Sequence, residues 1–463
     1  MAKAVSVVSR IVPVPAPPAG YAAVREKLSF LDAPWVATPP LQQVYLYELA
    51  GGGHEFPALV RRLKESLAAT LALYLPLAGK LAYAAETGDV VVDCSDAGVD
   101  FFEAQADGDV RRLAGDGDGD DGARDVPAFL SLVPEHDARV LPAAVLRVQV
   151  TRLGVREGDR AGLAIGVSLH HAVADGLAMA LFVGAWASAC RRGSPVLPRP
   201  LVGPPEHGRN AVAHAHPRGE DLARAVLKKV APNLPVANET EDYLSHRARL
   251  ARRAFTLGAD HPRPKPVSTF VAVSALCWTA FVRANGLAAG ADAHLVFQVD
   301  LRARLRPPVG ARYSGNCIRG CLASADAGEL LGEAGLLHAS RAVRAAVREV
   351  EAAPVAGMGS WVERAMRLPP SRVACVAGGP GFRVYEMNDF GFGRPGCVEP
   401  VSMAGSPLLL EKHNAADWVN GEGTIVLYAG KGYGEVYVSV TLDPTRVDAF
   451  KAHIISDRVR PRI

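Results

Sequence analysis

Residues 162–179 read GLAIGVSLHHAVADGLAM and predict a buried strand, a turn and an amphipathic helix. The apolar run from Leu163 to Leu169 has no polar face, as expected of a strand that is buried on both sides. Two histidines, His170 and His171, stand at its end. A buried imidazole ring must find hydrogen-bond partners, so two such rings in a row are costly to place without a purpose.

The turn after these histidines has a simple chemical interpretation. We expect His171 to face a cavity as a general base, because a histidine with a pKa near neutrality can take up a proton and return it. Asp175, four residues later, is expected to point away from the substrate and to hold the local backbone. Gly176 permits a tight turn into the helix that follows.

Length and composition restrict the class of protein. A chain of 463 residues predicts two domains. An apolar content of 49% with 21% charged residues is typical of a soluble globular protein, and a net charge of +3 does not favour nucleic acid or an anionic membrane as a partner. No apolar run reaches about 18 residues, so no membrane-spanning helix is expected. The short apolar start breaks at prolines and does not resemble a signal peptide.

Neither a disulfide framework nor a metal site is expected. The 7 cysteines are scattered and have no CxxC spacing, which favours reduced thiols in a cytoplasmic protein. The acidic run at 115–122, GDGDGDDG, superficially resembles a calcium loop. An EF-hand needs glycine at its sixth position and glutamate at its twelfth, where this chain has Asp121 and Pro127. We therefore expect a surface loop.

The pattern along the chain predicts an N-terminal domain at 1–190, a crossover linker at 191–220 and a C-terminal domain at 221–463. The linker is rich in Pro, Gly, Arg and His and has no periodicity. Strands are predicted at 145–153, 162–169, 295–300, 424–429 and 435–442. Helices are predicted at 56–74, 222–230, 243–250, 268–283, 329–350 and 444–454, and a strand-to-loop passage is predicted at 381–393.

Several motifs together resemble the BAHD acyltransferase family of plants. His171-Ala-Val-Ala-Asp175-Gly176 matches its HxxxDG motif, and Asp389-Phe-Gly-Phe-Gly393 matches its DFGWG motif, with Phe392 in place of tryptophan. An isolated HxxxD occurs often by chance, whereas the two motifs in this order are specific. The segments at 75–81, 93–99 and 299–305 also resemble family segments. Tyr313–Cys317 resembles the YFGNC box of the branch that acylates anthocyanin and flavonoid glycosides, with Ser314 in place of phenylalanine.

The resemblance implies an α/β fold of the α+β type, similar to chloramphenicol acetyltransferase. Two similar domains, each a mixed β-sheet flanked by helices, would enclose a channel. Acyl-CoA would enter from one face and the acceptor from the other, with His171 midway. The early stretch at 28–49, which includes LSFLDAPWV and VYLYEL, resembles the same anthocyanin and flavonoid branch.

The resemblance also implies roles for individual residues. Asp175 would support the site through an ion pair with Arg302. Gly176, which follows Asp175, would support the same turn, and His170 would be structural. The motif residues Asp389, Gly391 and Gly393 would shape the channel without touching the reacting atoms.

The CoA contacts implied by the resemblance lie at the start of the helix at 268–283. Ser268 or Thr269 would cap this helix, and the candidate residues for binding CoA are Lys265, Ser268 and Thr269. The preceding segment GADHPRPKPV at 258–267 is shorter than in the family, where a helix usually stands. A solvated loop lysine is therefore the alternative for Lys265.

The resemblance to the anthocyanin and flavonoid branch, which mostly uses malonyl-CoA, implies transfer of a malonyl group from malonyl-CoA to a hydroxyl of a flavonoid, anthocyanin or other phenolic glycoside. No permanently bound cofactor and no covalent acyl-enzyme are expected, because proximity of both substrates at His171 suffices. The residue that binds the malonyl carboxylate and the oxyanion donor are not identified. The alternatives are a hydroxycinnamoyl-CoA donor and a catalytically inactive, ligand-binding member of the fold. A cytoplasmic monomer is expected.

Overall fold

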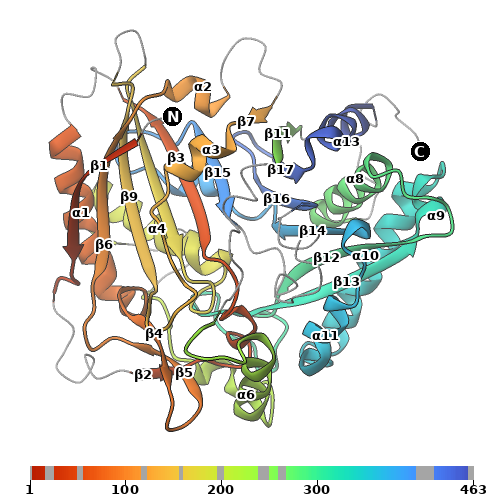
Figure 1. The fold of residues 1–463 in the computed structure, drawn as a ribbon, viewed down its shortest axis with the longest axis horizontal. Coiled ribbons are helices and arrows are strands. Elements are labelled where there is room, and N and C mark those ends of the chain that lie inside the picture. The colour runs from red at the N-terminus through yellow and green to blue at the C-terminus, as the bar shows by residue number, and fades with distance from the viewer. Residues whose placement is uncertain are drawn as a thin grey trace.

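The computed structural model describes residues 3–15, 25–49, 56–115, 122–155, 160–195, 203–237, 250–258, 267–402 and 422–456. Its two halves lie side by side in Figure 1, the N-terminal half on the left and the C-terminal half on the right. Each half is a mixed sheet flanked by helices, so the predicted fold class is confirmed.

The first sheet has six strands in the order β1-β6-β9-β10-β3-β15, with β6 and β9 parallel and the other neighbours antiparallel. Its strands are β1 (Lys3–Ile11), β3 (Leu41–Glu48), β6 (Val99–Ala106), β9 (Leu146–Leu153), β10 (Gly162–Leu169) and β15 (Cys397–Ser402). Every residue of β10 is buried, as its apolar run predicts.

Helices cover both faces of this sheet. Helix α1 (Phe56–Leu73) packs against α4 (Gly176–Arg192), where Trp186 Nε1 donates a 3.1 Å hydrogen bond to the backbone oxygen of Leu63. On the other face, α2 (Val110–Ala114) and α3 (Val126–Ser131) contribute to a second apolar cluster with residues of β3 and β10. This cover explains why the strand before His170 carries no polar face.

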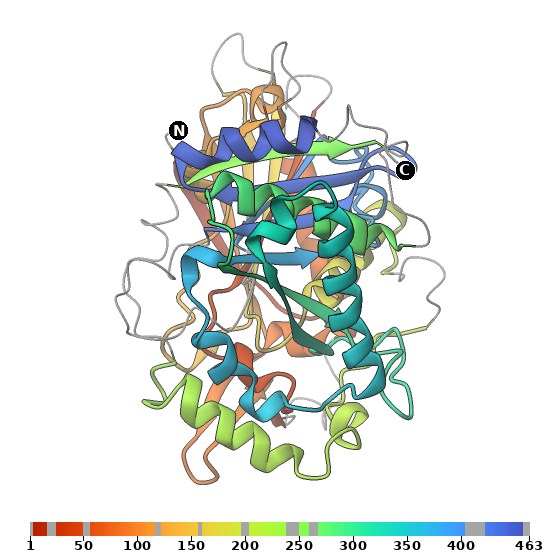
Figure 2. The ribbon, with the colours of Figure 1, turned by 90° about the vertical axis from the view of Figure 1, so that its right-hand side faces the viewer.

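The second sheet has seven strands in the order β13-β12-β14-β16-β17-β11-β7. They are β7 (Ala123–Arg124), β11 (Ala251–Leu257), β12 (Asp292–Asp300), β13 (Ile318–Asp326), β14 (Val373–Gly378), β16 (Thr424–Ala429) and β17 (Val436–Leu442). Figure 2 shows α8 (Thr269–Ala284), α10 (Gly335–Ala352) and α13 (Pro444–Ser456) in front of these strands. The predicted terminal hairpin and terminal helix are confirmed.

A smaller sheet of four strands, in the order β2-β5-β4-β8, lies low in the view of Figure 1, beside α6 (Gly219–Val230). Its strands are β2 (Arg25–Lys27), β4 (Lys80–Ala84), β5 (Asp89–Asp93) and β8 (Ala143–Ala144). The remaining short helices are α5 (Asn210–Ala213), α9 (Ala327–Leu331), α11 (Trp361–Met366), α12 (Val384–Met387) and the 3₁₀ turns η1 (Ala33–Trp35), η3 (Leu75–Ala78), η4 (Met358–Ser360) and η5 (Pro370–Arg372).

Each half contributes a strand to the other half's sheet. Strand β15 pairs with β3 in the first sheet, and β7 pairs with β11 in the second. Glu399 of β15 is fully buried and accepts hydrogen bonds from Tyr437 and Ser439 of β17, at 2.7 and 3.1 Å. Arg252 and Arg124 supply the positive charge beside it. This exchange ties the two halves together, while the boundaries proposed at 190 and 220 stay a prediction.

Two local predictions are wrong. The single helix predicted at 329–350 is divided into α9 and α10, because the chain is extended at Gly332, with φ −67° and ψ 173°. The passage predicted as strand-to-loop at 381–393 contains the short helix α12. Most of the helix predicted at 243–250, residues 243–249, and most of the acidic run, residues 116–121, lie outside the described residues.

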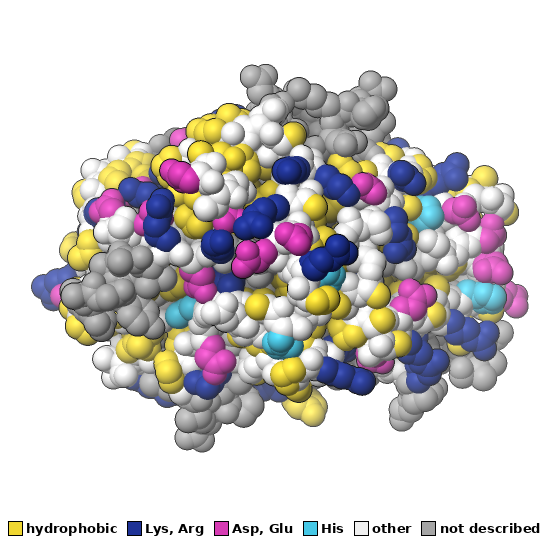
Figure 3. Space-filling model, turned by 90° about the horizontal axis from the view of Figure 1, so that it is seen from below, with side chains coloured by type: hydrophobic (Ala, Val, Ile, Leu, Met, Phe, Trp, Pro, Cys, Tyr) yellow, Lys and Arg dark blue, Asp and Glu magenta, His cyan; other side chains and the backbone are white. Residues whose placement is uncertain are grey.

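Charges of one sign are not segregated on the surface. Basic and acidic side chains are interspersed on the face seen in Figure 3. Within the described part of the chain, no helix is long and apolar enough to cross a membrane. The same residues contain no group of three or more His, Cys, Asp or Glu side chains that could hold a metal ion.

Candidate active site

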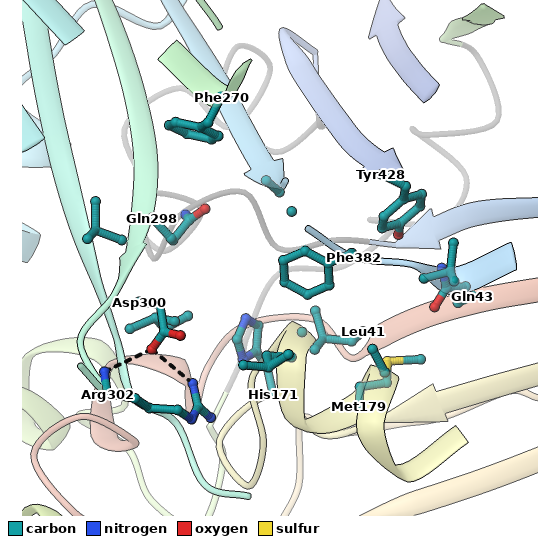
Figure 4. Close-up of a pocket in the computed structure, with 18 of the residues that line it drawn as sticks. Leu41, Gln43, His171, Met179, Phe270, Gln298, Asp300, Arg302, Phe382 and Tyr428 are labelled. Atoms are coloured by element: carbon teal, nitrogen blue, oxygen red, sulfur yellow. Dashed lines mark hydrogen bonds and ion pairs between the residues drawn. The ribbon is translucent and has the colours of Figure 1, made fainter. Parts of the chain in front are cut away.

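A cavity of about 330 Å³ lies between the two sheets, and His171 lines it. Figure 4 shows His171 near the middle of this cavity, with Phe382 beside it. The wall is mostly apolar. Its polar and charged lining residues, among those described, are Gln43, His171, Ser268, Gln298, Asp300, Arg302, Arg304 and Tyr428.

The ring of His171 is held in a dry environment. The residue is 3% exposed, and its ring stacks on Trp35 of η1 with 4.0 Å between centroids and 11° between planes. Burial lowers the pKa of His171 to about 4, although the charges of Asp175 and Asp32 act in the opposite direction. The imidazole is therefore neutral near pH 7. Its Nδ1 has no hydrogen-bond partner among the described residues.

Asp175 is engaged with the protein on both carboxylate oxygens. It is 0% exposed and caps α4, where Oδ1 accepts from the Ala178 backbone N–H at 2.9 Å. Oδ2 accepts from the Cys317 N–H at 3.0 Å and lies 2.9 Å from Arg302 Nη2. The pairing expected between Asp175 and Arg302 is therefore present, and it ties the start of α4 to the second half of the chain.

Arg302 holds the neighbouring turn as well as Asp175. Its guanidinium donates to the backbone oxygens of Tyr313 and Gly315, at 2.9 and 3.0 Å, and to Asp300 at 3.2 Å. Burial alone would lower the pKa of Arg302, but the charges of Asp175 and Asp300 raise it above its usual value. The group is a fixed cation that is satisfied by protein partners.

A second buried ion pair supports the histidine turn from its other side. Asp32 is 0% exposed, and its Oδ1 accepts from Asn316 Nδ2 at 2.9 Å. That amide also donates to the backbone oxygen of His171 at 2.9 Å. Arg209 Nε lies 3.4 Å from Asp32, and its Nη2 donates to the backbone oxygen of Val173 at 2.6 Å. Two backbone oxygens of the turn are thus held by side chains from distant segments.

Sequence reasoning did not single out this second pair. Asp32 and Trp35 lie within the LSFLDAPWV stretch, and Asn316 lies within the YSGNC box, so both motifs carried a signal that was not assigned to particular residues. Arg209 lies in the crossover linker, where no pattern distinguishes it from the other arginines.

The linker docks on the YSGNC turn through the residue that departs from the family box. His207 Nδ1 and the Ser314 hydroxyl form a short hydrogen bond, and His207 Nε2 donates to the Leu73 backbone oxygen at 2.6 Å. The Ser314 hydroxyl also lies 3.1 Å from the backbone oxygen of Glu206. Glu206 also pairs with Arg312. Because burial lowers the pKa of His207 to about 4, the ring is neutral in this arrangement. These contacts place Arg209 next to Asp32.

The DFGFG loop is built around Asp389. This carboxylate accepts from the N–H groups of Gly391 and Gly393, at 2.8 and 3.2 Å, and pairs with Arg191 of α4 at 2.8 Å. Both glycines have positive φ values, 95° and 101°, which other residues rarely adopt. The loop packs its aromatic rings inward: Phe390 contacts Trp186, and Phe392 meets Tyr47 edge-on at 4.8 Å.

The structure describes two of the three residues that were predicted to bind CoA. Ser268 lines the cavity and caps α8, its Oγ accepting from the Val271 N–H at 3.3 Å. Thr269 is the first residue of α8, beside that cap. Lys265 lies outside the described residues.

A family model described as the Transferase family matches residues 4–455. The chain belongs to the BAHD acyltransferase family. It is therefore an acyl-CoA-dependent acyltransferase, as its motifs predict. Phenolic glucoside malonyltransferase 2 of Arabidopsis thaliana is 29% identical over 395 residues, which cover 81% of this chain and 84% of that protein. The Arabidopsis malonyl-CoA:anthocyanidin 5-O-glucoside-6''-O-malonyltransferase is 30% identical over 410 residues, covering 81% and 85%. Hydroxycinnamoyltransferase 2 of Oryza sativa subsp. japonica is 27% identical over 426 residues, covering 88% of each.

Solved structures confirm the fold. Vinorine synthase superimposes with a TM-score of 0.70 over 98% of both chains, at 19% identity. The TRI101 protein of F. sporotrichioides, solved with coenzyme A and T-2, gives a TM-score of 0.58 at 16% identity, covering 93% of this chain and 97% of that one.

Proposed function

We propose that this acyltransferase moves a malonyl group from malonyl-CoA to a sugar hydroxyl of a phenolic glycoside, a flavonoid or anthocyanin glycoside included. The observation that carries the mechanism is that His171 lines the cavity while the Asp175 carboxylate is held by Arg302 and the Cys317 N–H. Burial lowers the pKa of His171, which favours the neutral ring that a base needs. In this proposal His171 is the catalytic base, and Asp175, Gly176 and Arg302 support it.

The proposed reaction proceeds without a covalent acyl-enzyme. His171 removes the proton of the acceptor hydroxyl as its oxygen attacks the thioester carbonyl. The tetrahedral intermediate then collapses, the C–S bond breaks, and the imidazolium returns the proton to the CoA thiolate. Among the described residues, the cavity lining contains no cysteine, and its serine, Ser268, caps α8. Holding both substrates together in this mostly apolar cavity supplies much of the rate.

Ser268 and Thr269 are proposed to contact CoA at the start of α8. The N-terminus of a helix carries a partial positive charge, which favours an anionic group such as a CoA phosphate. Lys265 is kept in this proposal from the family resemblance. The residues Asp389, Gly391 and Gly393 are proposed to shape the channel, since their loop packs on α4 and β3.

The malonyl donor is supported by relatives whose names specify malonyl transfer to phenolic and anthocyanin glucosides. A malonyl carboxylate needs a cation. Arg302 is committed to Asp175, so we assign this role to Arg304, which lines the cavity and pairs at 3.5 Å with the half-exposed Glu351. A hydroxycinnamoyl donor is the second candidate, because Phe270 and Phe382 give the cavity aromatic walls.

A donor competition tests this proposal. Free CoA is measured with malonyl-CoA and p-coumaroyl-CoA present together, with a panel of phenolic glucosides as acceptors. We expect malonyl transfer to dominate, and Arg304→Met to weaken malonyl transfer selectively. Preference for the aromatic donor would overturn the malonyl assignment. Tight binding of substrates without CoA release from any pair would instead indicate a ligand-binding protein. The cytoplasmic location and the monomeric state stay predictions, and gel filtration with light scattering tests the latter.

A further inference from the structure

Two adjacent glutamines on β3 differ in the hydrogen bonding of their side-chain amides. Gln42 and Gln43 are 5% and 4% exposed, and successive side chains of a strand point to opposite faces of the sheet. The amide of Gln42 is satisfied by the protein, because its Nε2 donates to Ser168 Oγ at 3.3 Å and to the Pro134 backbone oxygen at 3.4 Å. Gln43 lines the cavity.

The amide nitrogen of Gln43 has no such partner. Its Oε1 accepts a 2.8 Å hydrogen bond from the Tyr45 hydroxyl. Burial raises the pKa of Tyr45, so this hydroxyl keeps its proton and donates it. Gln43 Nε2 is buried and makes no hydrogen bond within the described residues. A buried donor without a partner is unfavourable, and a ligand that supplies an acceptor atom relieves that cost.

The surroundings of Gln43 restrict the chemistry of that ligand. Figure 4 shows Gln43 beside Tyr428 on one side of the cavity, while Asp300 and Arg302 lie on the other side, beyond Phe382 and His171. The Gln43 side therefore combines aromatic and apolar walls with a neutral amide donor. Such a site suits a flat, uncharged group that carries an ether, hydroxyl or carbonyl oxygen.

We propose that Gln43 is a specificity-determining residue that binds an oxygen atom on the aglycone of the acceptor. This inference rests on the proposed acyl transfer to a phenolic glycoside. We assign the anionic CoA to the start of α8. Phe270, the second residue of α8, lies apart from Gln43 in Figure 4. The side of the cavity that Gln43 lines is therefore assigned to the other substrate, the acceptor.

The test uses acceptors that differ by one oxygen. The probes are methoxyphenyl β-D-glucosides, substituted at the meta or para position, and the matching ethylphenyl β-D-glucosides, in which a CH₂ group replaces the oxygen. The variant is Gln43→Met, which keeps the length of the side chain and removes its donors. Gln42→Met is the matched control, because it changes the same residue type one position away on the opposite face.

We expect Gln43→Met to lower kcat/KM by roughly tenfold for at least one methoxyphenyl glucoside, the effect of one lost hydrogen bond to a neutral group. The corresponding ethylphenyl glucoside and the KM for acyl-CoA should change little. Gln42→Met should show no such selectivity. Equal losses for both acceptors, or a change confined to the acyl-CoA KM, would overturn the proposal.

A binding measurement separates this inference from the proposed function. Calorimetric titration of the glucosides without acyl-CoA reports the same oxygen preference even if no donor is turned over. Absence of turnover with a preserved Gln43-dependent preference would refute the acyl transfer alone. Turnover without that preference would refute the role of Gln43 alone.

Discussion

Replacing Asp175 by alanine should destabilise the protein by about 3–5 kcal/mol, the usual loss when one partner of a buried ion pair is removed. The structure explains the size. The change removes the cap of α4, the acceptor of the Cys317 N–H and the charge that faces the buried Arg302. We also expect kcat to fall by more than tenfold, because the turn that carries His171 loses its anchor to the second half.

Urea unfolding and initial rates of CoA release measure these two effects. Glu363→Ala is the control: Glu363 pairs with Lys229 at 2.6 Å, and both side chains are nearly half exposed, so its loss should change the free energy of unfolding only slightly. The double variant Asp175→Ala/Arg302→Met should be more stable than the sum of the two single losses predicts, because it leaves no unpaired buried charge. Full kcat together with unchanged stability in Asp175→Ala would refute the supporting role of Asp175.

The remaining predictions concern pH and the second ion pair. Since His171 acts as a base when neutral and burial lowers its pKa to about 4, kcat/KM should be flat near neutrality and fall with a midpoint near pH 4; a midpoint near 6.5 would contradict the buried, unsolvated ring. The free energy of unfolding should fall as the pH drops from about 6.5 toward 4. In this range the histidines of the unfolded chain become protonated, while the buried His170, His171 and His207 stay neutral because burial lowers their pKa. Urea unfolding at several pH values measures this loss. Arg209→Met should lower kcat more than either KM and destabilise by about 3 kcal/mol, because Asp32 loses its buried counter-charge; steady-state kinetics with wild-type kcat would refute this positioning role.

The sequence was informative where a residue's role follows from its neighbours along the chain. The buried strand β10, the turn after it and the cap of α4 lie within one short stretch, so the positions of His171 and Asp175 could be predicted. The partner Arg302 came from the family resemblance. The apolar periodicity of α1 and the cap at Ser268 were equally local signals.

Contacts between distant segments left no local signal. Asp32 and Trp35 come from one stretch near the N-terminus, while Arg209 and Asn316 come from two others. No periodicity relates these three segments to His171. The exchange of β7 and β15 between the sheets, with Glu399 buried at the junction, has the same origin. These features depend on tertiary packing, which overrides local preference.

The different surroundings of Gln42 and Gln43 on β3 also could not be predicted from the sequence. Strand alternation alone separates the faces of Gln42 and Gln43, but it does not say which face meets a cavity. The position of the second half decides that Gln43 lies across from Arg302. Ser314, which replaces the phenylalanine of the family box, is a similar case. Its hydroxyl forms a hydrogen bond with His207 of the linker, and the sequence does not show that these two residues meet.

The most direct test of the central claim is the rate of CoA release by the variant His171→Ala, measured with the best donor and acceptor of the wild-type protein. We predict that kcat falls by roughly 10²–10⁴-fold, the usual contribution of a positioned general base, while urea unfolding shows a folded protein that still binds acyl-CoA. A folded variant that releases CoA at the wild-type rate would show that His171 is not the base.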